Sequence, residues 1–288
     1  MKSINFRLRS DIKIGSGLLC NFFEEVGVLN ISKPLILCDV NIMEGDYFIK
    51  IKPLLEKYCI DGIFYELSLK GEPSYELLSK LLDDINLSEI DGVVSIGGGS
   101  TIDVGKGLAL LAKNPFEPKT LKGFPVNLNK PLPHITIPSI LGSGSEASFN
   151  AVFVDEAEGR KLGINYINNF PSLVLSDPDL SLSAPISSVI ASALDSMVHC
   201  VDSFGSIKAT PVSRMFSIEG FRNIWNFLNQ EDILSSSSRI PLALASIHGI
   251  YGLMNSGDGP TNGFAYYFGV KDKIPHGMAG GMFLKDVM

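Results

Sequence analysis

Short apolar runs and helical repeats alternate along the N-terminal part of the chain. The runs at 34–39 (PLILCD) and 92–96 (GVVSI) have the length and composition of strands buried on both faces. Residues 62–67 (GIFYEL) predict another strand. Residues 49–58 and 74–85 have helical periodicity, and the second stretch begins at a serine suited to cap a helix. This alternation of strand and helix predicts a parallel, doubly wound α/β sheet.

The pattern changes toward the C-terminus. Before the change, further strands are expected at residues 4–14, 134–138, 151–155 and 172–177. From residue 185 onward helical periodicity dominates and strand signals are few. This change predicts an α/β domain over residues 1–180 and an all-helical domain over residues 181–288.

A glycine-rich turn follows the strand expected at 92–96. The residues from Gly97 to Ser100 (GGGS) run into TIDVGKGLALLAK, which has helical periodicity. Glycines in a strand-to-helix turn let the backbone approach a phosphate, and the N–H groups at the helix start stabilise its charge. A tight turn that merely needs glycine is the alternative, and the pattern is not the GxGxxG fingerprint. A second loop, LGSGSEAS at 141–148, offers further hydroxyl and N–H groups to an anion.

Asp195 and His199 stand four residues apart in a segment with helical periodicity, so their side chains project from one face. A further histidine, His276, lies in KDKIPHGMAGG. A carboxylate with one or two imidazoles can supply ligands to zinc or ferrous iron. The other two histidines, His134 and His248, lie in apolar segments, where a structural role is the simpler interpretation.

Composition and charge exclude several classes of protein. Of the 288 residues, 45% are hydrophobic and 19% are charged, as in an ordinary globular protein. The net charge of −7 and the lack of a Lys/Arg cluster argue against a nucleic-acid partner. No apolar run reaches membrane-spanning length and no signal peptide is evident, so a cytoplasmic protein without a membrane partner is expected. The four cysteines lack CxxC spacing and are expected as buried free thiols, with Trp225 in the core.

Together the motifs resemble those of the iron-containing (group III, metal-dependent) alcohol dehydrogenases. The matching segments, in the family's order, are GGGSTIDVGKGLAL, TIPSILGSGSEAS, GRKLGI, SDPDLSLSAP, ALDSMVHCVDSF and IPHGMAGG. They span almost the whole chain, and the set is specific although no single segment is. The resemblance implies a dehydroquinate-synthase-like architecture, in which a dinucleotide-binding α/β domain and an all-helical domain hold a catalytic divalent metal, Fe²⁺ or Zn²⁺, in the cleft between them.

The family's functional positions carry over to particular residues of this chain. Asp39 matches the acidic residue associated with a preference for NAD over NADP, although by position alone it also fits a strand-ending turn. The other matches to cofactor contacts are Gly98, Gly99, Ser100, Ser139, Ser143, Ser148 and Lys161. Asp195, His199 and His276 match three of the family's four metal ligands.

Two positions depart from the family pattern. Fourteen residues before His276, where the family has its remaining ligand histidine, this chain has Asn262. Four residues further on, where many members have a histidine suited to proton relay, it has Tyr266. An amide oxygen is a poorer ligand than imidazole for zinc or iron. Asn262 thus completes the candidate metal set, while Tyr266 and His276 are the candidate catalytic residues.

The resemblance also predicts that the helical domain is incomplete at Met288, with apolar surface exposed as a result. It implies a metal-assisted, NAD(P)-dependent oxidoreductase that interconverts an alcohol and an aldehyde or ketone. The substrate would be a small molecule, and a homodimer is compatible with the pattern. Two alternatives remain open. One is an enzyme of the dehydroquinate-synthase-like group that uses NAD transiently or acts on phosphorylated sugars, and the other is a catalytically lapsed nucleotide-binding homologue, which Asn262 and Tyr266 favour.

Overall fold

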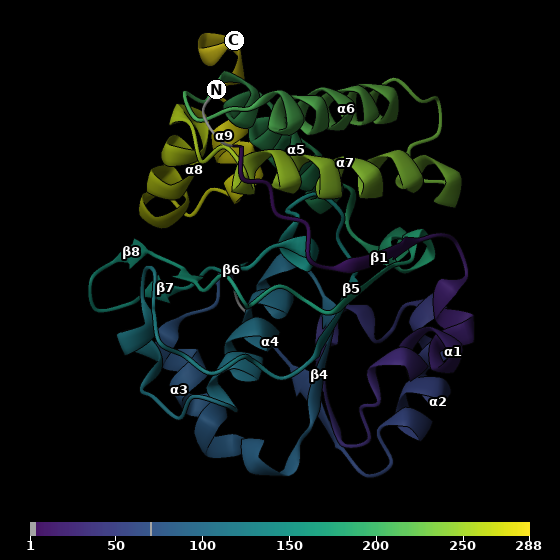
Figure 1. Cartoon of the computed structure of the whole chain (residues 1–288). Coiled ribbons are helices and arrows are strands. Elements are labelled where there is room, and N and C mark those ends of the chain that lie inside the picture. The colour runs from purple at the N-terminus through teal and green to yellow at the C-terminus, as the bar shows by residue number, and fades with distance from the viewer. Residues whose placement is uncertain (1–3, 70) are drawn as a thin grey trace. The chain divides into compact units, whose positions relative to one another are not determined.

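The computed structural model describes residues 4–69 and 71–288 and contains two compact units (Figure 1). The sheet unit consists of residues 10–139 and 148–183. The helical unit consists of residues 140–147 and 184–288, together with the N-terminal segment that ends at Arg9.

The sequence predicted a single domain boundary after residue 180, whereas the chain passes between the two units several times. The loop at 140–147 belongs with the helices because their side chains satisfy its backbone. The N–H groups of Gly142 and Gly144 both donate to Ser246 Oγ, at 3.1 and 2.9 Å. The hydroxyl of Ser196 donates to the carbonyl oxygen of Gly142 at 2.7 Å. These hydrogen bonds satisfy backbone groups that would otherwise be buried without partners, and they hold the loop in the helical unit.

The sheet unit is built on six parallel strands, which confirms the predicted doubly wound α/β class. The strand order is β1-β10-β5-β4-β2-β3. The bounds are β1 Asp11–Ile14, β2 Pro34–Asp39, β3 Ile63–Leu67, β4 Gly92–Gly97, β5 His134–Pro138 and β10 Leu173–Ser176. The chain runs from β2 outward to β3 and then returns to the other side of β2 for β4, so the winding direction reverses between β2 and β4.

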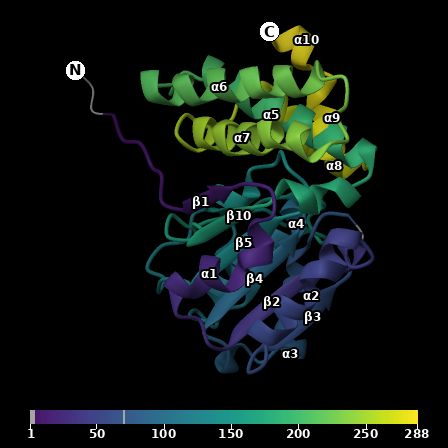
Figure 2. The same cartoon turned by 90° about the vertical axis from the view of Figure 1, so that its right-hand side faces the viewer.

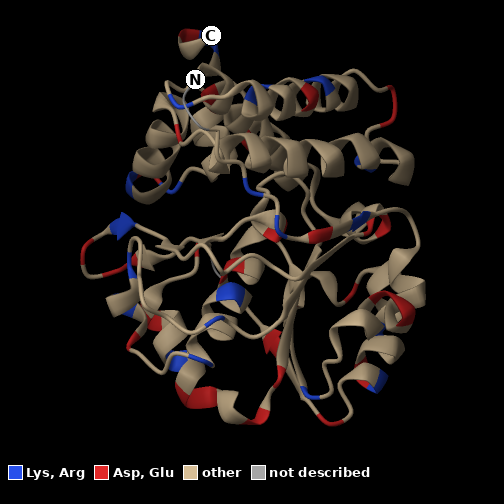
Figure 3. Ribbon diagram, in the orientation of Figure 1, with Lys and Arg blue, Asp and Glu red and all other residues tan. Residues whose placement is uncertain are grey.

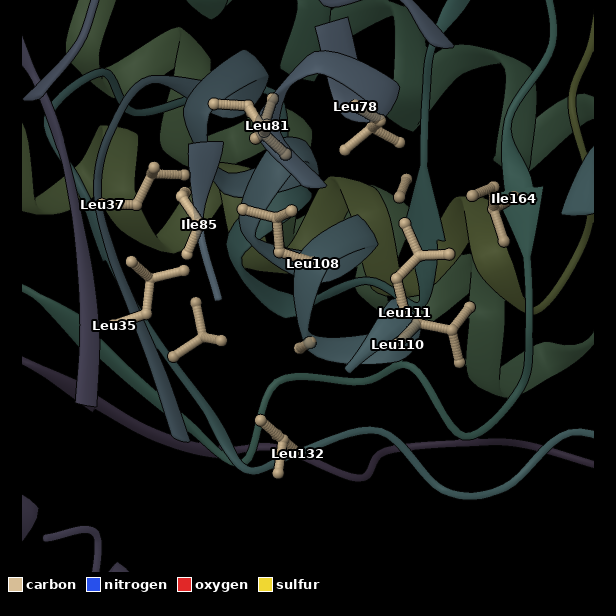
Figure 4. Close-up of a cluster of buried hydrophobic side chains, with 14 of the residues drawn as sticks. Leu35, Leu37, Leu78, Leu81, Ile85, Leu108, Leu110, Leu111, Leu132 and Ile164 are labelled. Carbon is tan, nitrogen blue, oxygen red and sulfur yellow. The ribbon is translucent and has the colours of Figure 1, made fainter. Parts of the chain in front are cut away.

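Helices cover both faces of this sheet. Their bounds are α1 Phe22–Val26, α2 Asp46–Tyr58, α3 Tyr75–Asp84 and α4 Gly99–Leu111. Successive residues of β2 point to opposite faces, so Leu35 and Leu37 pack in the core beneath α3 and α4, while Ile36 and Cys38 pack beneath α1 and α2. Figure 4 shows the first of these cores, with leucines of α3 and α4 against β2. The predicted cap of α3 is present, since Ser74 Oγ accepts the N–H of Leu77 at 3.2 Å.

Short 3₁₀ helices connect several of these elements. They are η1 Leu18–Asn21, η2 Gly27–Leu29, η3 Val40–Ile42, η4 Leu87–Glu89, η5 Pro118–Leu121, η6 Ser145–Ala147 and η7 Pro178–Ser183.

Two strand predictions are only partly right. The alternation over residues 4–14 yields a strand only at its end, in β1, because the residues up to Arg9 leave the sheet unit. The run at 151–155 does not enter the main sheet. It is divided between two antiparallel ribbons, β6 (Asn150–Ala151) with β9 (Ile164–Asn165), and β7 (Val154–Asp155) with β8 (Arg160–Lys161).

The helical unit contains α5 Ile186–Gly205, α6 Pro211–Leu228, α7 Ser236–Met254, α8 Pro260–Lys271, α9 His276–Gly281 and α10 Leu284–Val287 (Figure 2). A small buried cluster of Cys200, Ile224 and Ala245 joins α5, α6 and α7. Glycine permits this close packing, since a Cβ at Gly220 would lie 2.6 Å from the Cys200 sulfur.

Several apolar side chains of the helical unit are exposed. Trp225 is 60% exposed, so its predicted place in the core is wrong, and Ile207 is fully exposed. Cys20 is likewise exposed, unlike the other three free cysteines.

Acidic and basic residues are interspersed along the ribbon in Figure 3. Among the helices that the structure describes, none combines the length and apolar character needed to cross a membrane.

Candidate active site

The glycine-rich turn lies at the carboxyl edge of the sheet, where β4 runs into α4. Gly98 caps the helix, and the N–H of Ile102 donates to its carbonyl oxygen at 3.1 Å. A Cβ at Gly97 would lie 2.7 Å from the Thr101 side chain and 2.9 Å from Cβ of Asp39. Asp39, Gly98, Gly99 and Ser100 are therefore neighbours at the edge where the winding reverses. Open α/β sheets bind ligands at such a reversal, outside the carboxyl ends of the strands.

The Asp39 carboxylate also has a local structural role. Its Oδ1 accepts the backbone N–H of Asn41 at 2.9 Å and the Asn41 side-chain amide at 2.8 Å, and so caps η3. The position of Asp39 is thus compatible with both interpretations left open by the sequence, a residue that contacts the cofactor and a residue that ends a strand in a turn. Recognition of a ribose would fall to the other carboxylate oxygen.

The remaining predicted cofactor residues are distributed over both units. Ser139 is buried at the end of β5, where its N–H donates to Gly97 O at 2.9 Å. Lys161 Nζ lies 2.9 Å from Glu72 Oε1. Ser148 is buried beside α4, whereas Ser143 belongs to the helical unit and its Oγ accepts the N–H of Ser145 at 3.3 Å.

Lys106, which the sequence interpretation did not single out, is fully buried in α4. Its Nζ contacts Asp103 Oδ1 at 3.2 Å, Ser148 Oγ at 3.0 Å and the carbonyl oxygen of Asn150 at 2.6 Å. Asp103 Oδ2 accepts the N–H of Val152 at 2.9 Å. The pair therefore fastens the segment 148–152 to α4. The sequence signal for this buried lysine was its place as a single basic residue in the apolar helical segment VGKGLALLA.

In the helical unit, Asp195 and His199 lie on one face of α5 as predicted. The His199 Nε2 and Asp195 Oδ1 atoms are 3.5 Å apart, and both residues are buried. Asp195 Oδ1 is buried without a hydrogen-bond donor. A buried carboxylate oxygen in this state is costly unless a cation or donor stabilises it.

Glycines of α9 place His276 beside the same carboxylate. A Cβ at Gly277 would lie 1.9 Å from the carbonyl oxygen of Ala191, and one at Gly280 would lie 2.9 Å from a Val198 methyl group. Helix α9 therefore approaches α5 as closely as backbone allows, and His276 Nε2 lies 3.8 Å from Asp195 Oδ1.

Asp202 positions the start of α8 against this face of α5. Its two oxygens accept the N–H groups of Thr261 and Asn262, at 3.3 and 2.7 Å. Asn262 then donates from Nδ2 to Asp258 Oδ1 at 3.1 Å, and its Oδ1 lies 2.8 Å from His276 Nε2. The sequence interpretation missed Asp202 and Asp258. The signal for Asp202 was its spacing of seven residues after Asp195, which keeps both on one helix face.

Tyr266 packs against His276, the other candidate catalytic residue. Their rings meet edge to face, with centroids 5.0 Å apart at an interplanar angle of 74°. An apolar depression of about 710 Å³ lies on this unit. Among the described residues, Asp195 is the one acidic residue of its lining, which otherwise includes Ile190, Ile274 and Met278.

The donor set can be tested against a divalent cation. Among the residues described, no three His, Cys, Asp or Glu side chains are arranged as a metal site. However, ligands about 2.1 Å from one tetrahedral ion lie about 3.4 Å apart, close to the 3.5 and 3.8 Å that separate Asp195 Oδ1 from the two imidazoles. The Asp195 oxygen that lacks a hydrogen-bond donor and the two imidazoles match this spacing, whereas Asn262 Oδ1 lies 2.8 Å from His276 Nε2, at hydrogen-bond distance. The chemistry of Asp195, His199 and His276 and the two distances from the Asp195 oxygen are therefore compatible with a cation.

Comparisons with known proteins identify the family of the chain. Residues 10–178 match the family model of the iron-containing alcohol dehydrogenases, and the chain belongs to this family. It is 26% identical over 275 residues to alcohol dehydrogenase 4 of Schizosaccharomyces pombe, a match that covers 95% of this chain and 65% of the relative. It is 27% identical over 258 residues to the 4-hydroxybutyrate dehydrogenase of Clostridium kluyveri, covering 85% and 68% respectively. The chain therefore spans about two thirds of the length of these relatives.

Solved structures share the fold. An alcohol dehydrogenase from Oenococcus oeni superposes with a TM-score of 0.89 at 22% identity, covering 98% of this chain and 74% of that one. A sulfoacetaldehyde reductase from Bifidobacterium kashiwanohense, in complex with NAD⁺, superposes with a TM-score of 0.86 at 18% identity and covers 99% and 76%. The parallel sheet and the helices that follow it are thus those of this family.

Proposed function

We propose that this chain forms all or part of a metal-assisted, NAD-dependent oxidoreductase that interconverts an alcohol and an aldehyde or ketone. The observation that carries the proposal is the gathering of Asp195, His199, Asn262 and His276 within the helical unit. Relatives named alcohol dehydrogenase, 4-hydroxybutyrate dehydrogenase and NAD-dependent methanol dehydrogenase support the reaction class.

The sheet unit would bind the dinucleotide. N–H groups at the start of α4, from Gly99 and Ser100, point out of the helix and stabilise a pyrophosphate. The Asp39 carboxylate beside this turn would accept ribose hydroxyls and repel a 2′-phosphate, which favours NAD over NADP. When bound, the nicotinamide supplies the hydride acceptor or donor.

The helical unit would hold the substrate oxygen. A divalent cation bound there supplies Lewis-acid polarisation of that oxygen. Asp195 contributes a charged oxygen, while His199 and His276 contribute ring nitrogens. The apolar depression that Asp195 lines suits a small substrate with an aliphatic chain.

Tyr266 is placed to exchange a proton near the site. Its ring contacts the His276 ring edge to face. A phenol has a pKa near 10 in water, so proton transfer near neutral pH requires an adjacent cation to stabilise the phenolate. In this role Tyr266 takes the place of the histidine that many members have at this position.

The test combines binding and turnover. Purified protein is reconstituted with Zn²⁺, Fe²⁺ or Mn²⁺, and NADH binding, metal content and oxidation of short primary alcohols with NAD⁺ and NADP⁺ are measured. The variant His276→Ala should lose metal and turnover. His248→Ala is the matched control, because that imidazole packs against Phe216 instead of the site. Protein that binds neither NADH nor metal would refute the proposal.

A nucleotide-binding protein without redox activity is a second candidate, which the contact between Asn262 and His276 favours. An amide oxygen can only accept, so His276 Nε2–H is the donor in that 2.8 Å contact, and its lone pair becomes available to a cation only when this proton leaves. NADH binding with no turnover under any metal would support this second candidate.

A further inference from the structure

Asn262 is held more firmly than a residue that merely fills the place of a lost ligand. It is buried, and its backbone N–H donates to Asp202 Oδ2 at 2.7 Å. Asp202 is itself buried and belongs to α5, the helix that carries Asp195 and His199. The start of α8 is therefore fixed relative to the candidate cation ligands by a charge-assisted hydrogen bond.

Asp258 determines which end of the Asn262 amide faces the site. A carboxylate only accepts hydrogen bonds, so the amide nitrogen must be the group that meets Asp258 Oδ1 at 3.1 Å. The carbonyl oxygen of Asn262 then accepts the Nε2–H of His276 at 2.8 Å, and a cation bound by both atoms would displace that proton. Without this partner either end of the amide could face the histidine.

The resulting donor set is rich in oxygen. It contains the carboxylate of Asp195 and the amide carbonyl of Asn262, together with the imidazoles of His199 and His276. Imidazole suits zinc, iron and copper, whereas carboxylate and carbonyl oxygens suit manganese, magnesium and calcium. Exchanging an imidazole for a carbonyl oxygen therefore moves the preference of the site toward harder cations.

We propose that Asn262 is a neutral oxygen ligand aimed by Asp258, and that this arrangement shifts the site from Zn²⁺ toward a harder divalent cation such as Mn²⁺. Asp258 acts through Asn262 and is a positioning residue. The inference rests on the proposed function, since it assumes that the helical unit binds a divalent cation.

The experiment measures the dissociation constants of Mn²⁺ and Zn²⁺ calorimetrically for the full chain. Asp258→Ala should weaken Mn²⁺ binding by about 10- to 100-fold, as loss of a partner that orients a ligand commonly does. Asp258→Asn keeps an acceptor for the Asn262 amide and should retain most of the affinity. Asp272→Ala, which removes an exposed acidic side chain after α8, is the control for loss of one negative charge and should bind as the wild type does.

Variants of Asn262 test the preference itself. Asn262→His should raise the ratio of Zn²⁺ to Mn²⁺ affinity by at least about tenfold, and Asn262→Ala should weaken binding of both ions. Thermal unfolding of each apo variant separates ligand loss from misfolding.

The outcomes separate this inference from the proposed function. If the wild type binds neither ion, the proposed function loses its basis. If it binds both but Asn262→Ala binds as well or better, Asn262 competes for His276 instead of acting as a ligand, and the inference is overturned. Equal losses in Asp258→Ala and Asp258→Asn would show that Asp258 acts only by its charge.

Discussion

The backbone of Gly277 lies against the carbonyl oxygen of Ala191, so that a Cβ at residue 277 would come within 1.9 Å of that oxygen. The residue before this glycine is His276. The approach of two helix backbones thus determines where the imidazole lies relative to Asp195. We expect Gly277→Ala to force α9 away from α5, lowering stability by about 2 kcal/mol and abolishing tight metal binding.

The matched control is Gly263→Ala in α8. Gly263 is exposed and a Cβ there meets no atom within 4 Å, so alanine should be neutral or stabilising by about 0.5–1 kcal/mol. Calorimetric unfolding and metal titration of both variants check the prediction. A Gly277→Ala protein with wild-type stability and affinity would contradict it.

Asp202 should contribute to stability through the start of α8. Asp202→Asn removes the negative charge and leaves one of its two backbone N–H partners, Thr261 or Asn262, without an acceptor. We expect a loss of about 1–2 kcal/mol in the free energy of unfolding, measured by urea denaturation. Asp232→Asn, at an exposed turn where one oxygen accepts the N–H of Leu234, serves as the comparison and should change little.

Lys106 should be essential to the sheet unit. Lys106→Met leaves the Asp103 carboxylate without its cationic partner among buried side chains, and breaking such a pair costs about 3–5 kcal/mol. Lys113→Met, at an exposed position just after α4, should stay within about 0.5 kcal/mol of the wild type. Comparable unfolding midpoints for the two variants would mean that Lys106 is dispensable.

His134 predicts a pH dependence of stability. Burial, reinforced by the nearby charge of Lys106, lowers the pKa of His134 from 6.5 to about 3. The unfolded chain therefore takes up the proton first. The stability contributed by the neutral, folded histidine is present above pH 6.5 and falls by about 1.4 kcal/mol per pH unit as the pH drops toward 3.

The variant His134→Gln isolates this contribution. Glutamine can still bond to Ser95 Oγ, which lies 2.8 Å from His134 Nε2, but it does not titrate. The difference in unfolding free energy between variant and wild type should change steadily in favour of the variant from pH 6.5 downward. A constant difference between pH 7 and pH 4 would refute the prediction.

Much of the sheet unit could be predicted because local signals agreed with one another. For α3 the helical period and the Ser74 cap pointed to the same start, and for β4 the apolar run ended directly at Gly97. The residues at 4–9 alternate as well, but alternation does not say which partner a segment pairs with. Their place in the helical unit depends on contacts distant in sequence, such as the N–H of Arg7 donating to Asn255 Oδ1 at 2.8 Å.

The site was predictable only in part. The spacing of Asp195 and His199 revealed their common face, and the resemblance brought in His276 and Asn262. The helix cap by Asp202 and the amide orientation imposed by Asp258 depend on tertiary contacts. Trp225 was misjudged because a large apolar side chain is expected in a core, and sequence alone does not show which helix faces stay uncovered.

The chain passes between the two units at residues 9, 139, 147 and 183. A polypeptide limited to 184–288 would therefore contain every candidate metal ligand and still lack part of its own folding information. The hydroxyls of Ser192, Ser196 and Ser246 would lose the loop that they bond, including Glu146, whose carboxylate accepts from Ser246 at 2.6 Å. Transfer of the candidate cation site to another scaffold should therefore include the loop at 140–147, joined by a linker.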